Sequence, residues 1–221
     1  MCLGVPGPVF EPVETAPLAP LGSHSVFAGV DQNKVVTTIR MTEVAADPTN
    51  QLALEAAVRR RRKLVSDPRS TEDVRLCAVE RVTRAQVFEG ARSFAHCSLV
   101  GAVVSGRGRS GHGFEVTSLT DLLVGLSGVA AEATTGPVRI ELTDFDGSFG
   151  DALARVADRV STKRVACVVD GDRQTGRSYY TGEEMVEVGD GGFVDCAAAL
   201  LQSRKERLLI GGVSLERLAM I

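Results

Sequence analysis

Residues 138–169 read VRIELTDFDGSFGDALARVADRVSTKRVACVV and predict the most regular unit of the chain. Val138 to Leu142 is expected to be a strand, because its apolar, partly β-branched residues alternate with charged ones. Phe149 to Val160 carries apolar residues on one helical stripe, and Ser148 precedes it as a candidate cap. Arg164 to Val169 is a second apolar strand. Strand, helix and strand in this order predict a parallel, right-handed βαβ crossover.

The rest of the chain predicts more strand than helix. Apolar or β-branched runs indicate strands at residues 26–45, 94–105, 114–116 and 208–218. The remaining patterns indicate helices at residues 51–65 and 196–205, a capped apolar stretch at 120–133, a flexible basic loop at 106–113, and glycine-rich turns at 171–176 and 189–192. We therefore expect an α+β chain with a β-rich core and flanking helices. An α/β fold built around the parallel unit at 138–169 is the alternative.

Length and composition are those of a globular protein. The 221 residues are 44% hydrophobic and 24% charged, which is enough for a sizeable core. Five of the eight prolines lie in residues 1–23, which we expect to be an extended arm, with residues 24–221 as a single globular domain. The five cysteines include no Cys-x-x-Cys pair, which favours a reducing, intracellular setting. We expect no leader peptide and no membrane span, because no apolar run reaches the roughly 20 residues that a bilayer needs.

A run of five cations, Arg59-Arg60-Arg61-Arg62-Lys63, is the sharpest anomaly in the sequence. The formal net charge of the chain is -3, so any nucleic-acid binding must use a local patch rather than the whole surface. Consecutive cations spread around a helix axis, and cations also suit the exposed C-terminal turn of a helix. The two interpretations are a solvated helix end and a phosphate-binding patch, which Arg107 and Arg109 of the basic loop would extend.

Two acidic turns end the strands of the predicted βαβ unit. Asp144 opens the first turn, and Asp170 and Asp172 stand in the second. The C-terminal ends of parallel neighbours lie together, where clustered carboxylates can hold Mg²⁺. Ordinary turns, in which Asp and Gly are the commonest residues, are the competing interpretation. Asp170-Gly171-Asp172 also resembles the DxD motif of Toprim domains, and this resemblance implies metal ligands at Asp170 and Asp172, with Glu115 as the acid/base.

A second resemblance covers roughly residues 94–218. The apolar run from Cys97 to Gly106 and the segment from Gly113 to Asp121 are similar to the core of plant-virus movement proteins of the thirty-kilodalton superfamily. In that core an apolar strand and a loop precede a strand with a central Asp, and the segment from Gly136 to Asp144 fits the same pattern. The resemblance implies a jelly-roll-like β core, RNA binding and passage through plasmodesmata, without catalysis.

Three functions stay open on these observations. The first is a non-enzymatic, homo-oligomeric protein of the viral movement type, located in the cytoplasm or at host cell junctions. It would bind single-stranded nucleic acid through the cation run with Arg107 and Arg109, and would need no cofactor. The second is a Mg²⁺-dependent, Toprim-type nucleic-acid enzyme that uses Asp170 and Asp172. The third is a capsid-like structural protein. We prefer the first, because a chain with no evident nucleophile or acid/base pair is expected to bind rather than to catalyse.

Overall fold

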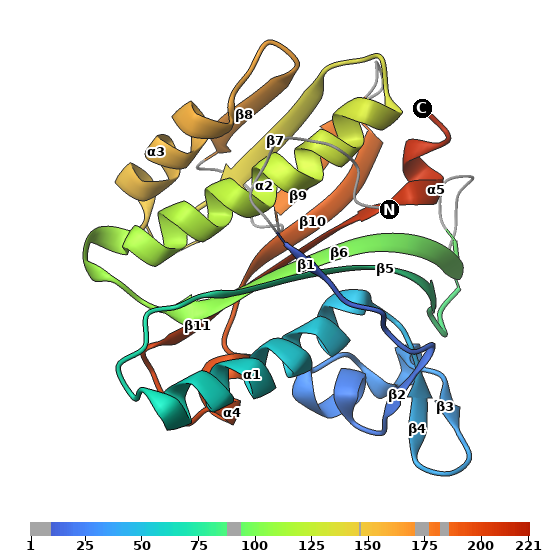
Figure 1. Cartoon of the computed structure of the whole chain (residues 1–221). Helices are drawn as coiled ribbons and strands as arrows, with labels where there is room; N and C mark the ends of the chain where they lie inside the picture. The colour runs from blue at the N-terminus through green and yellow to red at the C-terminus, as the bar shows by residue number, and fades with distance from the viewer. Residues whose placement is uncertain (1–9, 88–93, 146, 171–176, 182–185) are drawn as a thin grey trace.

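The computed structural model describes residues 10–87, 94–145, 147–170, 177–181 and 186–221. Within these residues, eight strands form one twisted sheet in the order β1-β5-β6-β11-β10-β9-β7-β8 (Figure 1). These strands are β1 (Glu11–Pro12), β5 (Val74–Thr83), β6 (His96–Arg107), β7 (Val138–Thr143), β8 (Val165–Asp170), β9 (Arg177–Thr181), β10 (Val186–Val194) and β11 (Glu206–Ser214). A small second sheet consists of β2 (Leu18–Pro20), β4 (Thr42–Val44) and β3 (Thr37–Thr38).

The helices are interspersed among these strands along the chain. They are α1 (Pro48–Ser66), α2 (Gly113–Ala133), α3 (Gly150–Val160), α4 (Cys196–Leu200) and α5 (Leu215–Leu218), with short helical turns η1 (Ser23–Phe27), η2 (Gln32–Lys34) and η3 (Ser110–His112). The chain is therefore of the α+β class that we expected, rich in antiparallel strands.

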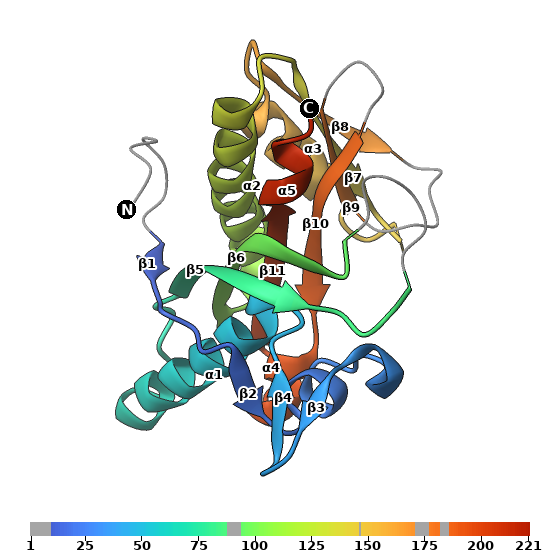
Figure 2. The same cartoon turned by 90° about the vertical axis from the view of Figure 1, so that its right-hand side faces the viewer.

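The jelly-roll-like core implied by the movement-protein resemblance is not what the strands form. A jelly roll packs two sheets against each other, whereas helices cover both faces of the large sheet here (Figures 1 and 2). Most neighbouring strands of the large sheet are antiparallel, and β6 pairs with β5 along residues 96–105 and with β11 along residues 99–107. Among the described strands, the pairs β1–β5 and β7–β8 are parallel.

Helix α1 covers one face of the sheet. Leu52 and Ala56 of α1 pack against Leu76 of β5, Val103 of β6 and Leu208 of β11 in one buried cluster. The helix was predicted from the sequence at 51–65, and it begins where the carboxylate of Asp47 accepts a hydrogen bond from the Thr49 backbone N–H at 2.9 Å. This face also carries α4, because Ala197 belongs to the same cluster.

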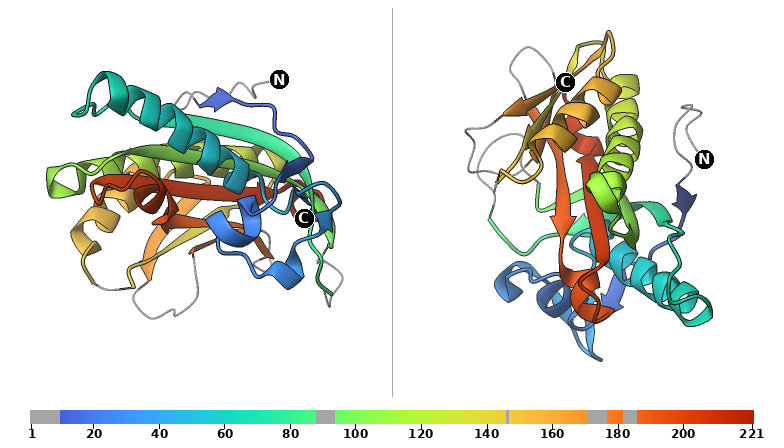
Figure 3. Two further views of the ribbon diagram at one scale, coloured as in Figure 1. Left: turned by 90° about the horizontal axis from the view of Figure 1, so that it is seen from below. Right: turned by 90° about the vertical axis from the view of Figure 1, so that its left-hand side faces the viewer.

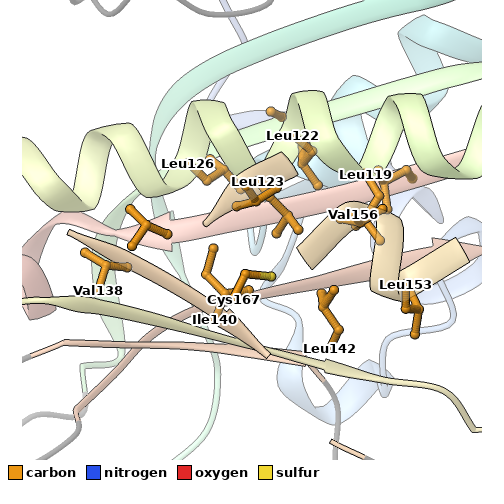
Figure 4. Packing of buried hydrophobic residues seen from close by; sticks show 14 of the residues in the cluster. Leu119, Leu122, Leu123, Leu126, Val138, Ile140, Leu142, Leu153, Val156 and Cys167 are labelled. Carbon is orange, nitrogen blue, oxygen red and sulfur yellow. The ribbon is translucent and has the colours of Figure 1, made fainter. Parts of the chain in front are cut away.

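Helices α2 and α3 cover the opposite face and close the larger core (Figure 4). Successive side chains of a strand point to opposite faces, so Val104 of β6 and Leu209 of β11 face α2, while their neighbours in sequence face α1. The buried stripe of α2 includes Leu119, Leu122 and Leu126, which recur at helical spacing, and Leu122 and Leu126 lie against Gly211 of β11.

The predicted βαβ unit is confirmed. β7 and β8 are parallel, in a register that runs from Val138↔Val165 to Thr143↔Asp170, and α3 crosses between them. The N-terminal turn of α3 is organised by Asp144, whose carboxylate accepts hydrogen bonds from Phe149 N at 2.7 Å and Gly147 N at 3.1 Å.

The prediction for residues 106–133 was wrong. Residues 114–116 form the first turn of α2 rather than a strand, and the stretch expected to be capped at residues 120–121 lies inside the same helix. Glycines suggested a flexible loop, but they only precede the helix, which starts after His112 in a left-handed conformation with φ 56°. By length and composition, the helical segment Ser110–Ala133 is apolar enough to cross a membrane. However, 56% of its most apolar 18-residue stretch is buried inside the protein, as in a core helix.

Three predictions for the C-terminal region also need correction. Residues 189–192 lie within β10 rather than in a turn. A Cβ on Gly191 would come within 2.5 Å of the Ile210 carbonyl oxygen of β11, so only glycine fits at this position. Here glycine serves a close approach of two strands. The helix expected at 196–205 is confined to α4, and the strand expected at 208–218 ends at Ser214, where α5 begins.

The N-terminal segment runs from the edge of the large sheet to the small sheet (Figure 3). The described part of the proline-rich arm is extended and hydrogen-bonded, with β1 beside β5 and β2 beside β4. Residues 26–45, predicted as strands, contain only the short β3 and β4 together with helical turns. Glu43 of β4 is fully buried (0% exposed) and accepts hydrogen bonds from Gly22 N, His24 N and Ser25 Oγ. The ring of His24 is also fully buried and its Nδ1 lies 2.8 Å from Asn50 Nδ2.

Candidate ligand-binding site

The cation run lies on the last turns of α1, and one of its members, Arg60, is buried in the core. Arg60 is fully buried (0% exposed), and its guanidinium donates to both carboxylate oxygens of Glu206, at 2.7 and 3.2 Å. The sequence predicted an exposed turn, and for Arg60 this was wrong. Residues 52, 56 and 60 follow at four-residue spacing on the face of α1 that packs on the sheet. Arg60 is therefore inaccessible to a phosphate.

Two further members of the run form ion pairs at the surface. Arg59 contacts carboxylates of β1 and its own helix, and Lys63 contacts a carboxylate before β5; the partners are Glu11 and Glu55, and Glu72. Arg61 and Arg62 are exposed and form no ion pair within the described part of the chain. The run therefore offers far less free positive charge than its sequence suggests.

Arg107 and Arg109 lie beside the segment that follows α1. Arg107 donates to the carbonyl oxygen of Pro68 at 2.9 Å. Arg109 donates to the carbonyl oxygen of Thr71 at 2.9 Å and to the carboxylate of Asp73 at 2.7 Å. The fold thus brings the basic loop close to the end of the cation run, but these contacts tie the two segments together rather than form a shared open patch.

The predicted acidic site is not assembled as expected. Glu115 lies on α2 instead of on a strand, and Asp121, also on α2, forms an ion pair with Arg75 at 3.1 Å. Asp170 ends β8, and Asp172 lies outside the described residues. In the part of the chain that the structure describes, no group of three or more His, Cys, Asp or Glu side chains is arranged to hold a metal ion.

A cavity of about 240 Å³ lies on the α1 face of the sheet, above β6, β11 and β10. Its floor is bare because Gly212 of β11 stands between Gly101 of β6 and Asp190 of β10, and two of these three residues lack a side chain. The N-terminus of α1, the end of β5 and the helix α5 supply the walls. The side chains that line the cavity include Asp47, Thr49, Arg84, Phe94, Cys97, Leu99, Glu187, Asp190, Ser214 and Arg217.

Charges of both signs face this cavity. The guanidinium of Arg84 contacts the carboxylate of Asp47 at 3.3 Å, and Arg217 donates to the backbone carbonyl of Glu187 at 3.0 Å. Asp190 completes the set of three carboxylates and two guanidiniums. Opposite charges in one small recess are suited to a ligand that itself carries both signs.

Asp190 is an acidic side chain in the lining of the cavity. Its carboxylate reaches solvent through the recess, and it has no hydrogen-bond or ion-pair partner among the described residues. Burial by the surrounding protein raises its pKa most, the negative charges of Asp47 and Glu187 raise it further, and Arg84 and Arg217 act in the opposite direction. A carboxylate in this state gains a favourable partner when a cationic group enters the cavity.

The cavity also holds a thiol that is not activated. Burial raises the pKa of Cys97, so the nucleophilic thiolate is disfavoured there. Sequence reasoning missed this site because Gly189-Asp190-Gly191-Gly192 was interpreted as a turn. The available signal was an acidic residue among glycines, together with a second glycine pair, Gly211-Gly212, later in the chain. Glycines of this kind are typical of close strand contact beneath a ligand.

No protein-family model and no curated protein sequence matches the chain. The fold, in contrast, is similar to solved structures of aminoacyl-tRNA synthetases. Histidyl-tRNA synthetase from S. aureus has a TM-score of 0.64 at 12% sequence identity, over 96% of this chain and 60% of that one. A pyrrolysyl-tRNA synthetase from Desulfitobacterium hafniense has a TM-score of 0.53 at 12% identity, over 96% of this chain and 62% of that one. The chain thus spans about three-fifths of the length of these proteins.

These likenesses overturn the functional expectations drawn from the sequence. The resemblance to viral movement proteins was wrong, because the fold is similar to these two synthetase structures. The assignments to movement through plasmodesmata, to a Toprim-type enzyme and to a capsid-like protein fall with it. At 12% identity the comparison establishes the fold, and function has to be argued from the cavity.

Proposed function

We propose that this chain binds a free amino acid in the sheet cavity and activates its carboxylate for transfer to tRNA, as an aminoacylation enzyme does. The fold supports the reaction class, since both neighbours are named as tRNA synthetases. The observation that carries the proposal is the unpaired carboxylate of Asp190 in a recess that also holds two guanidiniums. An amino acid presents an ammonium and a carboxylate that complement this set.

The arrangement of charges suggests how such a ligand is oriented. Its ammonium would face Asp190 and the nearby Glu187, and its carboxylate would face Arg84 or Arg217. A cationic partner favours the charged form of Asp190, whose pKa burial otherwise raises. Amino-acid binding should therefore tighten as the pH rises through the raised pKa of this carboxyl group.

The size of the cavity limits the ligand. Its volume of about 240 Å³ is below the roughly 300–1,000 Å³ of sites for drug-sized ligands. This favours a single small amino acid in the cavity, with any nucleotide placed outside it.

A second candidate function is amino-acid binding without activation. It is favoured by the excess of carboxylates over guanidiniums in the cavity, because a polyphosphate would be repelled there. In that case the chain would retain the synthetase architecture as a binding module, and tRNA would not be a partner.

Calorimetric titration with each of the standard amino acids tests the shared part of both candidates. We expect one or a few amino acids to bind, and Asp190→Asn to weaken the binding at least tenfold. Asp195→Asn, which changes an exposed aspartate next to α4 and outside the cavity, is the matched control and should bind normally. If no amino acid binds at millimolar concentration, both candidates are wrong.

Pyrophosphate exchange with ATP and charging of tRNA then separate the candidates. Exchange that requires the same amino acid and disappears in Asp190→Asn supports activation. Binding without exchange or charging supports the binding module.

A further inference from the structure

A second recess lies at the opposite end of the same strands, where the loop from β6 enters α2. Figure 1 places this loop at the left of the molecule, and the right panel of Figure 3 views the molecule from that side. The recess has a volume of about 360 Å³, and the residues that matter for its chemistry are Arg109, Glu115, Phe149, Arg204, Lys205 and Arg207. On β11 this recess is lined by Arg207, which contacts Glu115 of α2, whereas Gly212 lies under the sheet cavity on the α1 side, so the two sites lie on opposite faces of the sheet.

The recess is strongly cationic. Four of its side chains, Arg109, Arg204, Lys205 and Arg207, are positively charged, against the single carboxylate of Glu115. Arg204 and Lys205 are exposed and form no ion pair among the residues that the structure describes. The N-terminus of the 21-residue helix α2 also lies here, and its dipole adds to the positive potential. An anionic group is therefore the natural occupant.

The two remaining arginines are held in place. Arg109 is fixed by the carboxylate of Asp73 at 2.7 Å and lies over the ring of Phe114, with its guanidinium carbon 5.9 Å from the ring centre. Arg207 donates to the carbonyl of Arg204 at 2.6 Å, which links it to the exposed pair. Such anchoring pre-organises the cationic wall before any ligand arrives.

Among the described residues, Glu115 lacks a hydrogen-bond donor for one of its oxygens, and a phosphate alone does not supply one. Its side chain is 9% exposed, and one oxygen, Oε1, accepts a hydrogen bond from Arg207 Nε at 3.3 Å. The other oxygen, Oε2, is buried and has no hydrogen-bond partner within the described residues. A buried carboxylate oxygen without a donor is costly, and a ligand hydroxyl beside the anionic group would supply that donor.

The backbone and the aromatic wall leave room for such a ligand. A Cβ placed on Gly111 would meet no atom within 4 Å, so the loop does not fill the recess from that side. The ring of Phe149, whose centre lies 4.6 Å from that of the His112 ring, forms an apolar wall next to Glu115. An apolar wall, a free acceptor and a cationic rim together suit a hydroxylated ligand with a phosphate.

We propose that this recess is a binding site for a small sugar phosphate. Arg204 and Lys205, with Arg207 behind them, bind the phosphate oxygens. A sugar hydroxyl donates to the carboxylate of Glu115, and the sugar lies against Phe149. The site is separate from the sheet cavity and does not depend on amino-acid binding there.

Calorimetric titration of the full chain with ribose 5-phosphate, inorganic phosphate and ribose tests the proposal. We expect ribose 5-phosphate to bind at least tenfold more tightly than phosphate, ribose to show no binding, and the affinity to fall as NaCl is raised from 50 to 200 mM. The double variant Arg204→Ala/Lys205→Ala should lose binding of both phosphates at least tenfold. Arg61→Ala/Arg62→Ala removes two exposed cations from α1 and should change nothing.

Glu115→Gln separates the two halves of the site. It should abolish the preference for ribose 5-phosphate over inorganic phosphate, while phosphate itself should bind as tightly or more tightly because a nearby negative charge is removed, with folding verified by thermal unfolding. Absence of ribose 5-phosphate binding at millimolar concentration would overturn the proposal. So would equal affinity in Arg204→Ala/Lys205→Ala, or binding of an RNA oligonucleotide but not of the free sugar phosphate.

Discussion

Replacement of Arg60 by methionine tests whether the cation run is structural. The substitution removes the guanidinium that donates to Glu206, a side chain only 1% exposed, and to the backbone carbonyls of Ser70 and Glu72 at 2.6 and 3.0 Å. Breaking a buried ion pair by removing one partner typically costs about 3–5 kcal/mol, because the other charge stays buried. Since a domain is stabilised by about 5–15 kcal/mol in total, Arg60→Met should lose a large share of its stability.

Urea unfolding followed by far-ultraviolet circular dichroism measures this loss. We expect the free energy of unfolding of Arg60→Met to fall by about 3–5 kcal/mol with an unchanged dependence on urea. Arg61→Met, at the next and exposed position, should change it by less than about 0.5 kcal/mol. The double variant Arg60→Met/Glu206→Leu should recover most of the loss, because a buried ion pair can often be replaced by apolar side chains at little net cost.

Two results would refute this reasoning. If Arg60→Met costs no more than Arg61→Met, then Arg60 is exposed, as the sequence alone suggested. If the double variant is as unstable as Arg60→Met, the ion pair with Glu206 is not the cause of the loss.

Three further measurements test other parts of the structure. Gly191→Ala should lower the free energy of unfolding by about 1–3 kcal/mol, because its Cβ would lie 2.5 Å from a carbonyl oxygen of β11. Gly150→Ala, at a position with open space around it, should raise the free energy of unfolding by about 0.4–1 kcal/mol. Equal effects of the two substitutions in thermal unfolding would contradict the strand contact. Burial raises the pKa of Cys167 to about 12, so iodoacetamide at about pH 8 should label this thiol only after unfolding, and rapid native labelling seen by mass spectrometry would place it at the surface. Burial lowers the pKa of His24 below 6.5, so below that pH the unfolded state binds more protons and the free energy of unfolding should decline as the pH falls. His24→Gln should flatten this dependence of stability on pH. An unchanged pH dependence would assign it to other groups, such as Glu43, whose pKa is also lowered.

Local periodicity accounts for what the sequence predicted well. The apolar stripe of α3 and the apolar strands on either side specify the βαβ unit within a few dozen residues, and α1 has a clear cap at Asp47. In α2 the same signal was present, but the glycines before it and the apolar residues on several of its sides obscured the helical period. The pairing of β7 with β8 could be predicted, whereas β6 and β11 pair with each other from distant parts of the chain.

The candidate sites escaped prediction because their residues meet only through tertiary structure. Arg60 and Glu206 are 146 positions apart, so the sequence shows a cation run but not its buried partner. Asp190 sits in a glycine-rich segment whose glycines permit close strand contact, a need that becomes visible only when Ile210 is known to lie opposite. The sequence shows the cations of the run but not the carboxylates that pair with several of them.

Strand β11 connects these observations, because its alternating side chains serve both faces of the sheet. Glu206 points to the α1 face and neutralises Arg60, while the next residue, Arg207, points to the α2 face and contacts Glu115. Farther along, Gly212 again faces α1 and leaves the floor of the cavity bare beside Asp190. A shift of β11 by one residue would send each of these groups to the wrong face. The stability of the fold, the sheet cavity and the cationic recess therefore depend on a single register, and the buried ion pair between Arg60 and Glu206 helps to fix it.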